Sequence, residues 1–298
     1  MRVFVTGAAG FVGRHLLERL QEDGHELRAS DRELDVAEPR VIEPALAEFR
    51  PDAVVHLAAQ SSVAASWDDP SGTFRTNYLG SRAILRAATR GPRQPRVLLV
   101  CSSDAYGSSA PHAAAFTENS PLRPGSPYAR TKVAADLLGA VYQARGLDVV
   151  RARSFNHSGP GQSDVFVLPS FARQVAEIAA GAREPRLRVG NLDSLRDFLD
   201  VDDVIEAYLA LIDPAVPAGA YNVASGVARR VGDALDTILE LAGVRAEVEV
   251  DPERLRPTDI AVGDASRLRE ATGWAPRVSF RETLARVVED WRERVSVA

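Results

Sequence analysis

The chain has 298 residues, which is enough for a large core in one or two domains. Hydrophobic residues make up 45% and charged residues 26%, and the formal net charge of −5 argues against a nucleic-acid partner. The one cysteine, Cys101, excludes an intrachain disulfide and a cysteine metal cluster, so we expect no metal. Because no apolar run approaches the ~20 residues that span a bilayer, and the N-terminus lacks a signal-peptide stretch, we expect a soluble cytoplasmic protein with no membrane partner.

Short runs rich in β-branched residues alternate with helix-length amphipathic segments through the first half of the chain. The pattern predicts strands at 3–5, 26–30, 53–57, 97–101 and 149–152, and helices that include 12–22 and 73–88. This alternation predicts an α/β fold, in which a doubly wound parallel sheet is covered by helices on both faces. Such a sheet binds ligands at the carboxyl ends of its strands.

A glycine turn joins the first strand to the first helix, with the sequence Thr-Gly-Ala-Ala-Gly-Phe-Val-Gly at residues 6–13. The glycines let the backbone approach a pyrophosphate, and the helix N-terminus supplies N–H groups and a positive dipole end. The turn therefore predicts a Rossmann-type site for a dinucleotide. The residues that we expect to contact the cofactor there are Gly7, Gly10, Phe11, Val12 and Gly13.

Two adjacent charges at the end of the second strand point to opposite cofactors. Asp31 can accept hydrogen bonds from an adenosine ribose and would repel a 2′-phosphate. Arg32 could instead pair with that phosphate. The choice between NAD(H) and NADP(H) is therefore open. Asp35 and Val36 follow so soon that the usual next strand is shortened or absent.

Polar residues follow the strand at 97–101. A hydroxyl there, from Ser102 or Ser103, can hold a substrate oxygen. Asp104 either forms a local Asx turn or takes part in catalysis.

Tyr128 and Lys132 stand four residues apart, which places both on one face of a helix that Ser126 and Pro127 can start. We expect the Lys132 ammonium and the positive charge of a bound nicotinamide to lower the pKa of the Tyr128 phenol. The phenol could then exchange a proton with a sugar hydroxyl or ketone.

The alternation of predicted strands and helices becomes less regular after residue 155. Pro169 can open a helix that runs to about residue 180, and further helices are expected at 202–211, 231–241 and 280–295, with a strand at 220–223. We interpret 1–155 as the dinucleotide-binding domain and 156–298 mainly as a smaller substrate-binding lobe. Chain from about 190–225 is expected to return to the first domain.

These motifs together resemble the extended short-chain dehydrogenase/reductase family, along nearly the whole chain. Its Thr-Gly-x-x-Gly-x-x-Gly motif matches residues 6–13 and its Tyr-x-x-x-Lys motif matches Tyr128 and Lys132. The resemblance implies that Lys132 and Tyr128 also hold the cofactor, and that Ser102 is the catalytic hydroxyl, with Ser103 the alternative. The further cofactor contacts that it implies are Asp35, Val36, Leu57, Ala58, Ala59, Asn77 and Phe155.

The C-terminal half is similar to the GDP-sugar branch of that family, which includes reductases of 4-keto-6-deoxy sugars. The segments at 155–162, 189–198 and 256–259 carry this similarity. It implies that Arg196 and Arg256 bind the nucleotide diphosphate and that Asn156 binds the pyrophosphate or sugar. The other substrate contacts that it implies are Ser103, Asp104, Val189, Asn222 and Asp259.

The resemblance implies NAD(P)H-dependent reduction of the C4 ketone of a GDP-4-keto-6-deoxyhexose, giving a D-rhamno product. An epimerase or 4,6-dehydratase of the same family is the nearest alternative, and a non-catalytic nucleotide-binding regulator would be expected to lack Tyr128 or Lys132. The strand-end segment Ser-Ser-Asp-Ala-Tyr-Gly shortens one acid and loses another relative to the Ser-Ser-Glu-Glu-Tyr-Gly that is common in such reductases. The family also implies a homodimer.

Overall fold

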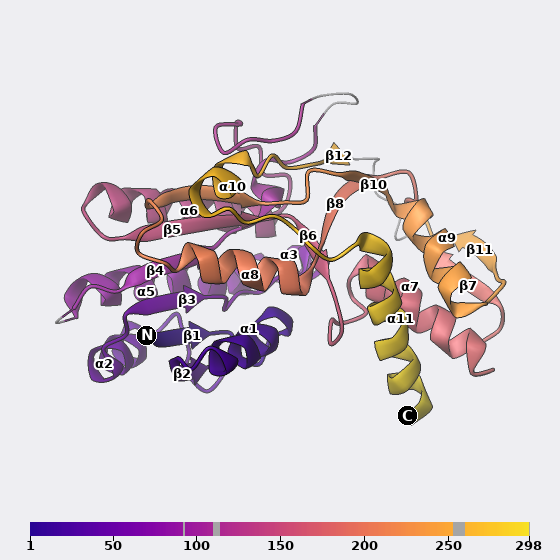
Figure 1. Cartoon of the computed structure of the whole chain (residues 1–298), viewed down its shortest axis with the longest axis horizontal. Helices are drawn as coiled ribbons and strands as arrows, with labels where there is room; N and C mark the ends of the chain where they lie inside the picture. The colour runs from indigo at the N-terminus through magenta and orange to yellow at the C-terminus, as the bar shows by residue number, and fades with distance from the viewer. Residues whose placement is uncertain (92, 110–113, 253–259, 298) are drawn as a thin grey trace.

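The computed structural model describes residues 1–91, 93–109, 114–252 and 260–297, and its centre is a six-stranded sheet (Figure 1). Every pairing in this sheet is parallel, as the alternation of strands and helices predicts. The strands, in spatial order, are β2 (Glu26–Ser30), β1 (Arg2–Thr6), β3 (Ala53–His56), β4 (Arg96–Val100), β5 (Val149–Ser154) and β9 (Gly219–Val223).

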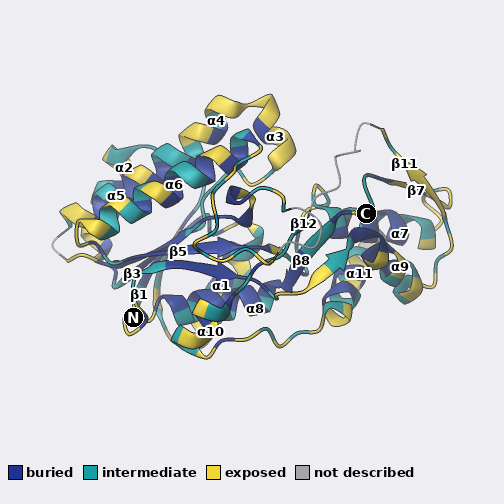
Figure 2. Cartoon of the chain, turned by 90° about the horizontal axis from the view of Figure 1, so that it is seen from above, coloured by how far each residue is buried: buried dark blue, intermediate teal, exposed yellow. Residues whose placement is uncertain are grey.

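Helices cover both faces of the sheet (Figure 2). One face carries α2 (Pro39–Phe49), α5 (Gly80–Arg90) and α6 (Pro127–Ala144), and its core includes the fully buried Ile42 and Ile84. The other carries α1 (Phe11–Glu22), α8 (Val201–Leu211) and α10 (Ser266–Thr272), around Leu16 and Tyr208. The doubly wound fold predicted from the sequence is therefore confirmed.

A smaller lobe lies beside the carboxyl ends of these strands. Helices α7 (Val167–Ala179), α9 (Val231–Ala242) and α11 (Phe280–Val297) pack together over a two-stranded sheet, β7 (Arg186–Val189) and β11 (Glu247–Val250). Short strands connect this lobe to the main sheet. They are β6 (Asn156–Ser158), β8 (Leu195–Asp200), β10 (Ala228–Arg230) and β12 (Ile260–Ala261).

Two features of the fold differ from the sequence pattern. The helix predicted at 73–88 is divided into α4 (Pro70–Phe74), a π-helical turn η1 (Arg75–Leu79) and α5, after the short α3 (Val63–Asp68). The α2 helix and the short strands of the C-terminal half were not among the predicted elements. Strand β9 joins the main sheet beside β5, so chain after residue 155 contributes to it. The exact division at residue 155 stays a prediction.

None of the described helices is both long and apolar enough to cross a bilayer.

Candidate active site

The glycine turn forms a cradle that only glycine can build. Gly7 has a φ of +71°, and a Cβ on it would lie 2.7 Å from the Ala58 backbone nitrogen. A Cβ on Gly13 would lie 2.3 Å from the Gly7 carbonyl oxygen. Among the described residues no side chain caps the N-terminus of α1, so the N–H groups of its first turn remain available to an anion. The residues present therefore fit a dinucleotide pyrophosphate.

One of the residues after β2 forms a hydrogen bond with the backbone of the glycine turn. The Asp31 carboxylate accepts hydrogen bonds from the backbone N–H of Ala9 at 2.8 Å and of Arg32 at 2.9 Å. The Arg32 side chain is exposed and makes no hydrogen bond or ion pair within the described part of the chain. Asp35 pairs with Arg75, which lowers the pKa of the Asp35 carboxyl, and Val36 is buried.

Tyr128 and Lys132 lie on α6 and are nearly buried, with 8% and 6% of their surface exposed. The α6 helix begins at Pro127, and the Ser126 hydroxyl caps it by accepting the N–H of Ala129. Lys132 Nζ donates to the Val100 carbonyl at 2.9 Å and lies 6.0 Å from the centroid of the Tyr128 ring. The predicted pair is therefore placed at the carboxyl end of β4.

The expected lowering of the Tyr128 pKa is not what the protein alone produces. Burial raises the pKa of the phenol above its usual value, the Asp104 carboxylate adds to the rise, and the Ser102 side chain opposes it. Burial also lowers the pKa of Lys132. The Lys132 ammonium donates to the Val100 backbone carbonyl.

Ser102 and Ser103 are both buried beside this pair. Ser102 starts a short 3₁₀ turn, η2 (Ser103–Ala105), and its hydroxyl accepts the N–H of Asp104 at 3.2 Å. The Ser102 side chain acts to lower the pKa of the Tyr128 phenol, and which of the two serines is the catalytic hydroxyl stays a prediction. Asp104 is exposed, and its charge reaches the phenol.

Sequence reasoning missed that Asn77 ties three elements together. Its amide exchanges hydrogen bonds with the Gln60 backbone at 2.8 and 3.0 Å and donates to Thr131 Oγ1 on α6 at 3.0 Å. Asn77 is 1% exposed. It therefore holds the segment after β3 against the catalytic helix, and its predicted cofactor contact stays untested. Leu57, Ala58 and Ala59 in that segment are partly exposed, as a cofactor-lining stretch requires.

The substrate residues predicted in the C-terminal half divide into three groups. Asn156 is exposed on β6, and Arg196 is partly exposed on β8. Val189 and Asn222 are 0% exposed, and their predicted substrate contacts stay predictions. Phe155 is also buried. Arg256 and Asp259 lie outside the described residues.

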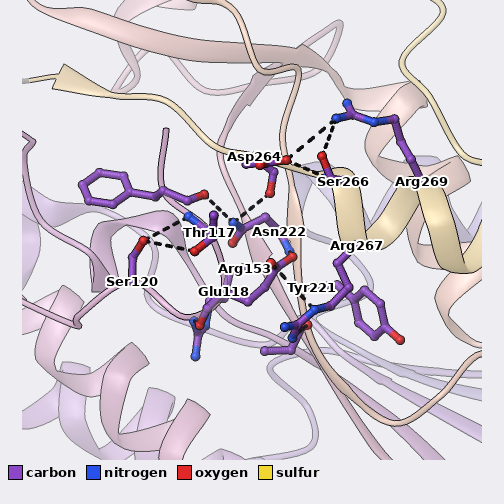
Figure 3. A network of polar contacts seen from close by, with 12 residues as sticks. Thr117, Glu118, Ser120, Arg153, Tyr221, Asn222, Asp264, Ser266, Arg267 and Arg269 are labelled. Atoms are coloured by element: carbon purple, nitrogen blue, oxygen red, sulfur yellow. Dashed lines mark hydrogen bonds and ion pairs between the residues drawn. The ribbon is translucent and has the colours of Figure 1, made fainter. Parts of the chain in front are cut away.

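Asn222 is instead part of a polar network that includes Glu118, Arg153 and Asp264 (Figure 3). Its carbonyl accepts from the Tyr106 hydroxyl at 2.7 Å, and its amide donates to the backbone carbonyls of Phe116 at 2.7 Å and Asp264 at 3.1 Å. Arg153 donates to the same Tyr106 hydroxyl. All polar atoms of the Asn222 side chain are thus used within the protein.

Lys132 is the only lysine in the sequence. Lys and Arg together number 36, so all the others are arginines. Every other basic position is arginine, including those in ion pairs. A lysine ammonium is a compact point charge whose pKa responds to burial, whereas guanidinium is broad and always charged. The single exception therefore falls at the position where these two cations are chemically least interchangeable.

Comparison with known proteins agrees with this geometry. A family model described as GDP-mannose 4,6 dehydratase matches residues 31–287. The chain is 37% identical over 299 residues to the GDP-6-deoxy-D-mannose reductase of Pseudomonas aeruginosa, covering 99% of this chain and 98% of that protein. It is 30% identical over 318 residues to the UDP-glucose 4-epimerase of Mycolicibacterium smegmatis, covering 99% of both.

Among solved structures, RMD from Pseudomonas aeruginosa complexed with NADPH is similar, with a TM-score of 0.91 and 36% identity over 98% of this chain and 99% of that one. The resemblance predicted from the motifs is thereby confirmed. The chain belongs to the GDP-mannose 4,6 dehydratase family, within the NAD(P)-dependent oxidoreductases.

Proposed function

We propose that this protein reduces the C4 ketone of a GDP-4-keto-6-deoxyhexose with NADPH, giving GDP-D-rhamnose. The observation that carries the proposal is the full-length similarity to a GDP-6-deoxy-D-mannose reductase. The placement of Tyr128, Lys132 and Ser102 at one strand end supports it, because these are the groups that carbonyl reduction needs.

The glycine turn would hold the pyrophosphate of the dinucleotide, and the bound cofactor would supply the hydride that reduces the ketone carbon. Ser102 orients the ketone oxygen, and Tyr128 gives its phenolic proton to the alkoxide that forms there. Because burial raises the pKa of Tyr128, the phenol remains protonated at neutral pH, as a proton donor must. Lys132 holds the cofactor ribose near the phenol. Arg196 pairs with the nucleotide diphosphate.

Dehydration makes a stronger demand on this site. It requires a base to remove the C5 proton of the sugar, and near-attack geometry is sensitive to about 1 Å. The charge of Asp104 reaches the Tyr128 phenol, but the Asp104 side chain is one methylene shorter than a glutamate at that position would be. Ala105, next to it, is fully buried and has no acid to offer. Reduction needs only the hydride and the Tyr128 proton.

The test compares three reactions of the purified protein. We expect oxidation of NADPH with the GDP-4-keto-6-deoxy sugar and none with GDP-mannose plus catalytic NADP⁺. Formation of the ketosugar from GDP-mannose would replace the proposal with a dehydratase. Interconversion of UDP-glucose and UDP-galactose without net change in the cofactor would replace it with an epimerase.

Cofactor choice follows from the two charges after β2. Both Asp31 carboxylate oxygens are engaged by backbone N–H groups, whereas the exposed Arg32 guanidinium is available for a 2′-phosphate, so NADPH is preferred. Arg32→Ala should weaken NADPH binding by about 10-fold or more, because a hydrogen bond to a charged group contributes ~1.5–3 kcal/mol. NADH binding should change little. Fluorescence titration of both cofactors measures this, and equal losses for the two would assign Arg32 elsewhere.

The proposal extends to a homodimer in the cytoplasm. On α6, Leu137 and Val141 lie one turn apart and are 53% and 45% exposed, so they form an apolar pair on the helix surface. A second copy of α6 would cover them. Light scattering of the purified protein tests the dimer.

A further inference from the structure

A row of buried polar side chains crosses three neighbouring strand ends beneath the active site. Thr6 ends β1 and His56 ends β3, and the two are paired in register. His56 is in turn paired with Leu99 of β4, the residue before Val100, whose carbonyl accepts from Lys132. Thr6, His56 and Lys132 are 0%, 2% and 6% exposed. The catalytic lysine is thus next to a buried histidine that the reaction described above does not use.

The two nitrogens of His56 have different surroundings. Nδ1 lies 2.8 Å from Thr6 Oγ1, which also accepts the N–H of Ala58 at 3.3 Å. Nε2 is buried and has no hydrogen-bond partner among the described residues. A buried ring nitrogen without a partner costs free energy unless a water or another group satisfies it. The free side of the ring is therefore the side that needs a ligand.

The ring is neutral, so it can offer one lone pair. Burial and, secondarily, the positive charge of Lys132 lower the pKa of His56 to about 3. The neighbouring ammonium favours the tautomer with its proton on Nδ1, donated to Thr6 Oγ1, and with the lone pair on Nε2. His56 is then a buried acceptor on the strand beside β4, whose last residue, Val100, binds Lys132.

The Lys132 ammonium has N–H donors that its contact with Val100 does not use. An ammonium carries three N–H groups, and Val100 accepts one of them within the protein. We infer that His56 Nε2 accepts a second hydrogen bond from the Lys132 ammonium through one bridging water, which makes His56 a positioning residue for Lys132. This inference rests on the proposed function for its consequence in catalysis, but the contact itself can be measured without any substrate.

The other ionisable groups near Lys132 do not supply this acceptor. Tyr128, from the same helix, presents its ring at 6.0 Å. The thiol of Cys101, at the end of β4, stays protonated because burial raises its pKa strongly. Asp136, one turn further along α6, is bound by Arg151 and Arg153. Asp104 acts on the Tyr128 phenol.

A hydrogen bond to the ammonium favours its charged form and so opposes the effect of burial on the Lys132 pKa. Removing the acceptor should lower that pKa. Because Lys132 is the only lysine, protein labelled with [ε-¹³C]lysine gives one NMR signal, whose shift with pH reports the titration of this single group.

Two substitutions separate the functions of the two ring nitrogens. In His56→Asn the amide reaches only the place of Nδ1, so the Thr6 contact is kept and the Nε2 contact is lost. In His56→Gln the amide reaches the place of Nε2. We expect the lysine signal to titrate lower by about 1 pH unit or more in His56→Asn and close to the wild-type value in His56→Gln.

A third variant controls for a general structural disturbance around His56. Thr6→Val removes the partner of Nδ1 and keeps Nε2, so the titration of Lys132 should not move. The inference is overturned if His56→Asn titrates as the wild type does, or if Thr6→Val shifts the lysine signal as much as His56→Asn. Thermal melts and NADPH binding check that each variant is folded.

The catalytic consequence is measured separately. Because the ammonium form of Lys132 is needed, the alkaline limb of the kcat profile should move to lower pH in His56→Asn, by the same shift as the NMR titration, and return in His56→Gln. If the wild type does not reduce the ketosugar, the proposed function fails, while the NMR titration still decides the role of His56.

Discussion

Replacing Tyr128 with phenylalanine is expected to lower kcat for ketosugar reduction by about 10²–10⁴-fold, the usual contribution of a general acid. The substitution removes only the phenolic oxygen of a side chain that is 8% exposed and sits on the catalytic face of α6. NADPH affinity and the melting temperature should stay near their wild-type values, because the ring still fills its place and Lys132 keeps its bond to Val100.

Tyr142→Phe is the matched control, since Tyr142 lies on the same helix and is only partly buried. It should leave kcat unchanged. Near-normal turnover by Tyr128→Phe, measured as the initial rate of NADPH oxidation, would show that another group supplies the proton.

The pH dependence of the wild-type enzyme follows from the same buried pair. Burial raises the pKa of Tyr128, so the phenol remains a proton donor throughout the neutral range and well above it. Burial lowers the pKa of Lys132, so the ammonium is the first of the two to lose its proton as the pH rises. Activity should therefore fall on the alkaline side with the titration of Lys132, not of Tyr128.

The parts of the site that could be predicted from the sequence are those encoded by short spacings. The glycine turn, the Tyr128–Lys132 pair and the strand-end serines each depend on a few consecutive residues and on one helix or strand. The parallel sheet followed from the alternation of periods in the same way. Each motif of the site lies within about one element of secondary structure, whereas the prediction of the sheet rests on the order of several successive elements.

Features that depend on distant partners could not be predicted. Asn222 has a structural role because its side-chain carbonyl accepts a hydrogen bond from the hydroxyl of Tyr106, which is 116 residues away in the sequence. Asn77 is engaged by Thr131, 54 residues along the chain. The pKa of Tyr128 rises because of the burial that the whole fold imposes. No local pattern marks an asparagine as structural or a phenol as desolvated, so their roles required the folded chain.

The largest stability effect is expected at Asp136, which follows Lys132 by one turn on the buried face of α6. Its side chain is 0% exposed. One carboxylate oxygen accepts from Arg153 Nε at 2.7 Å, and the other from Arg153 Nη2 at 2.9 Å and Arg151 Nη1 at 3.0 Å. Arg153 also donates to the Tyr106 hydroxyl and to the Glu118 carbonyl, both at 2.9 Å. The ion pair between Asp136 and Arg153 therefore links α6, β5 and the strand-end segment that contains Tyr106.

Asp136→Ala should lower the free energy of unfolding by about 3–5 kcal/mol, because it leaves the guanidinium groups of Arg151 and Arg153 in the interior without their anion. Those side chains are 13% and 6% exposed, so both guanidinium groups lie largely out of contact with bulk water. Urea denaturation followed by circular dichroism measures the change. Glu240→Ala is the control, since its pair with Arg281 is exposed on both sides and should leave the midpoint nearly unchanged. Equal midpoints for the two variants would mean that Arg151 and Arg153 find other acceptors, and that the position of the catalytic helix does not depend on this ion pair.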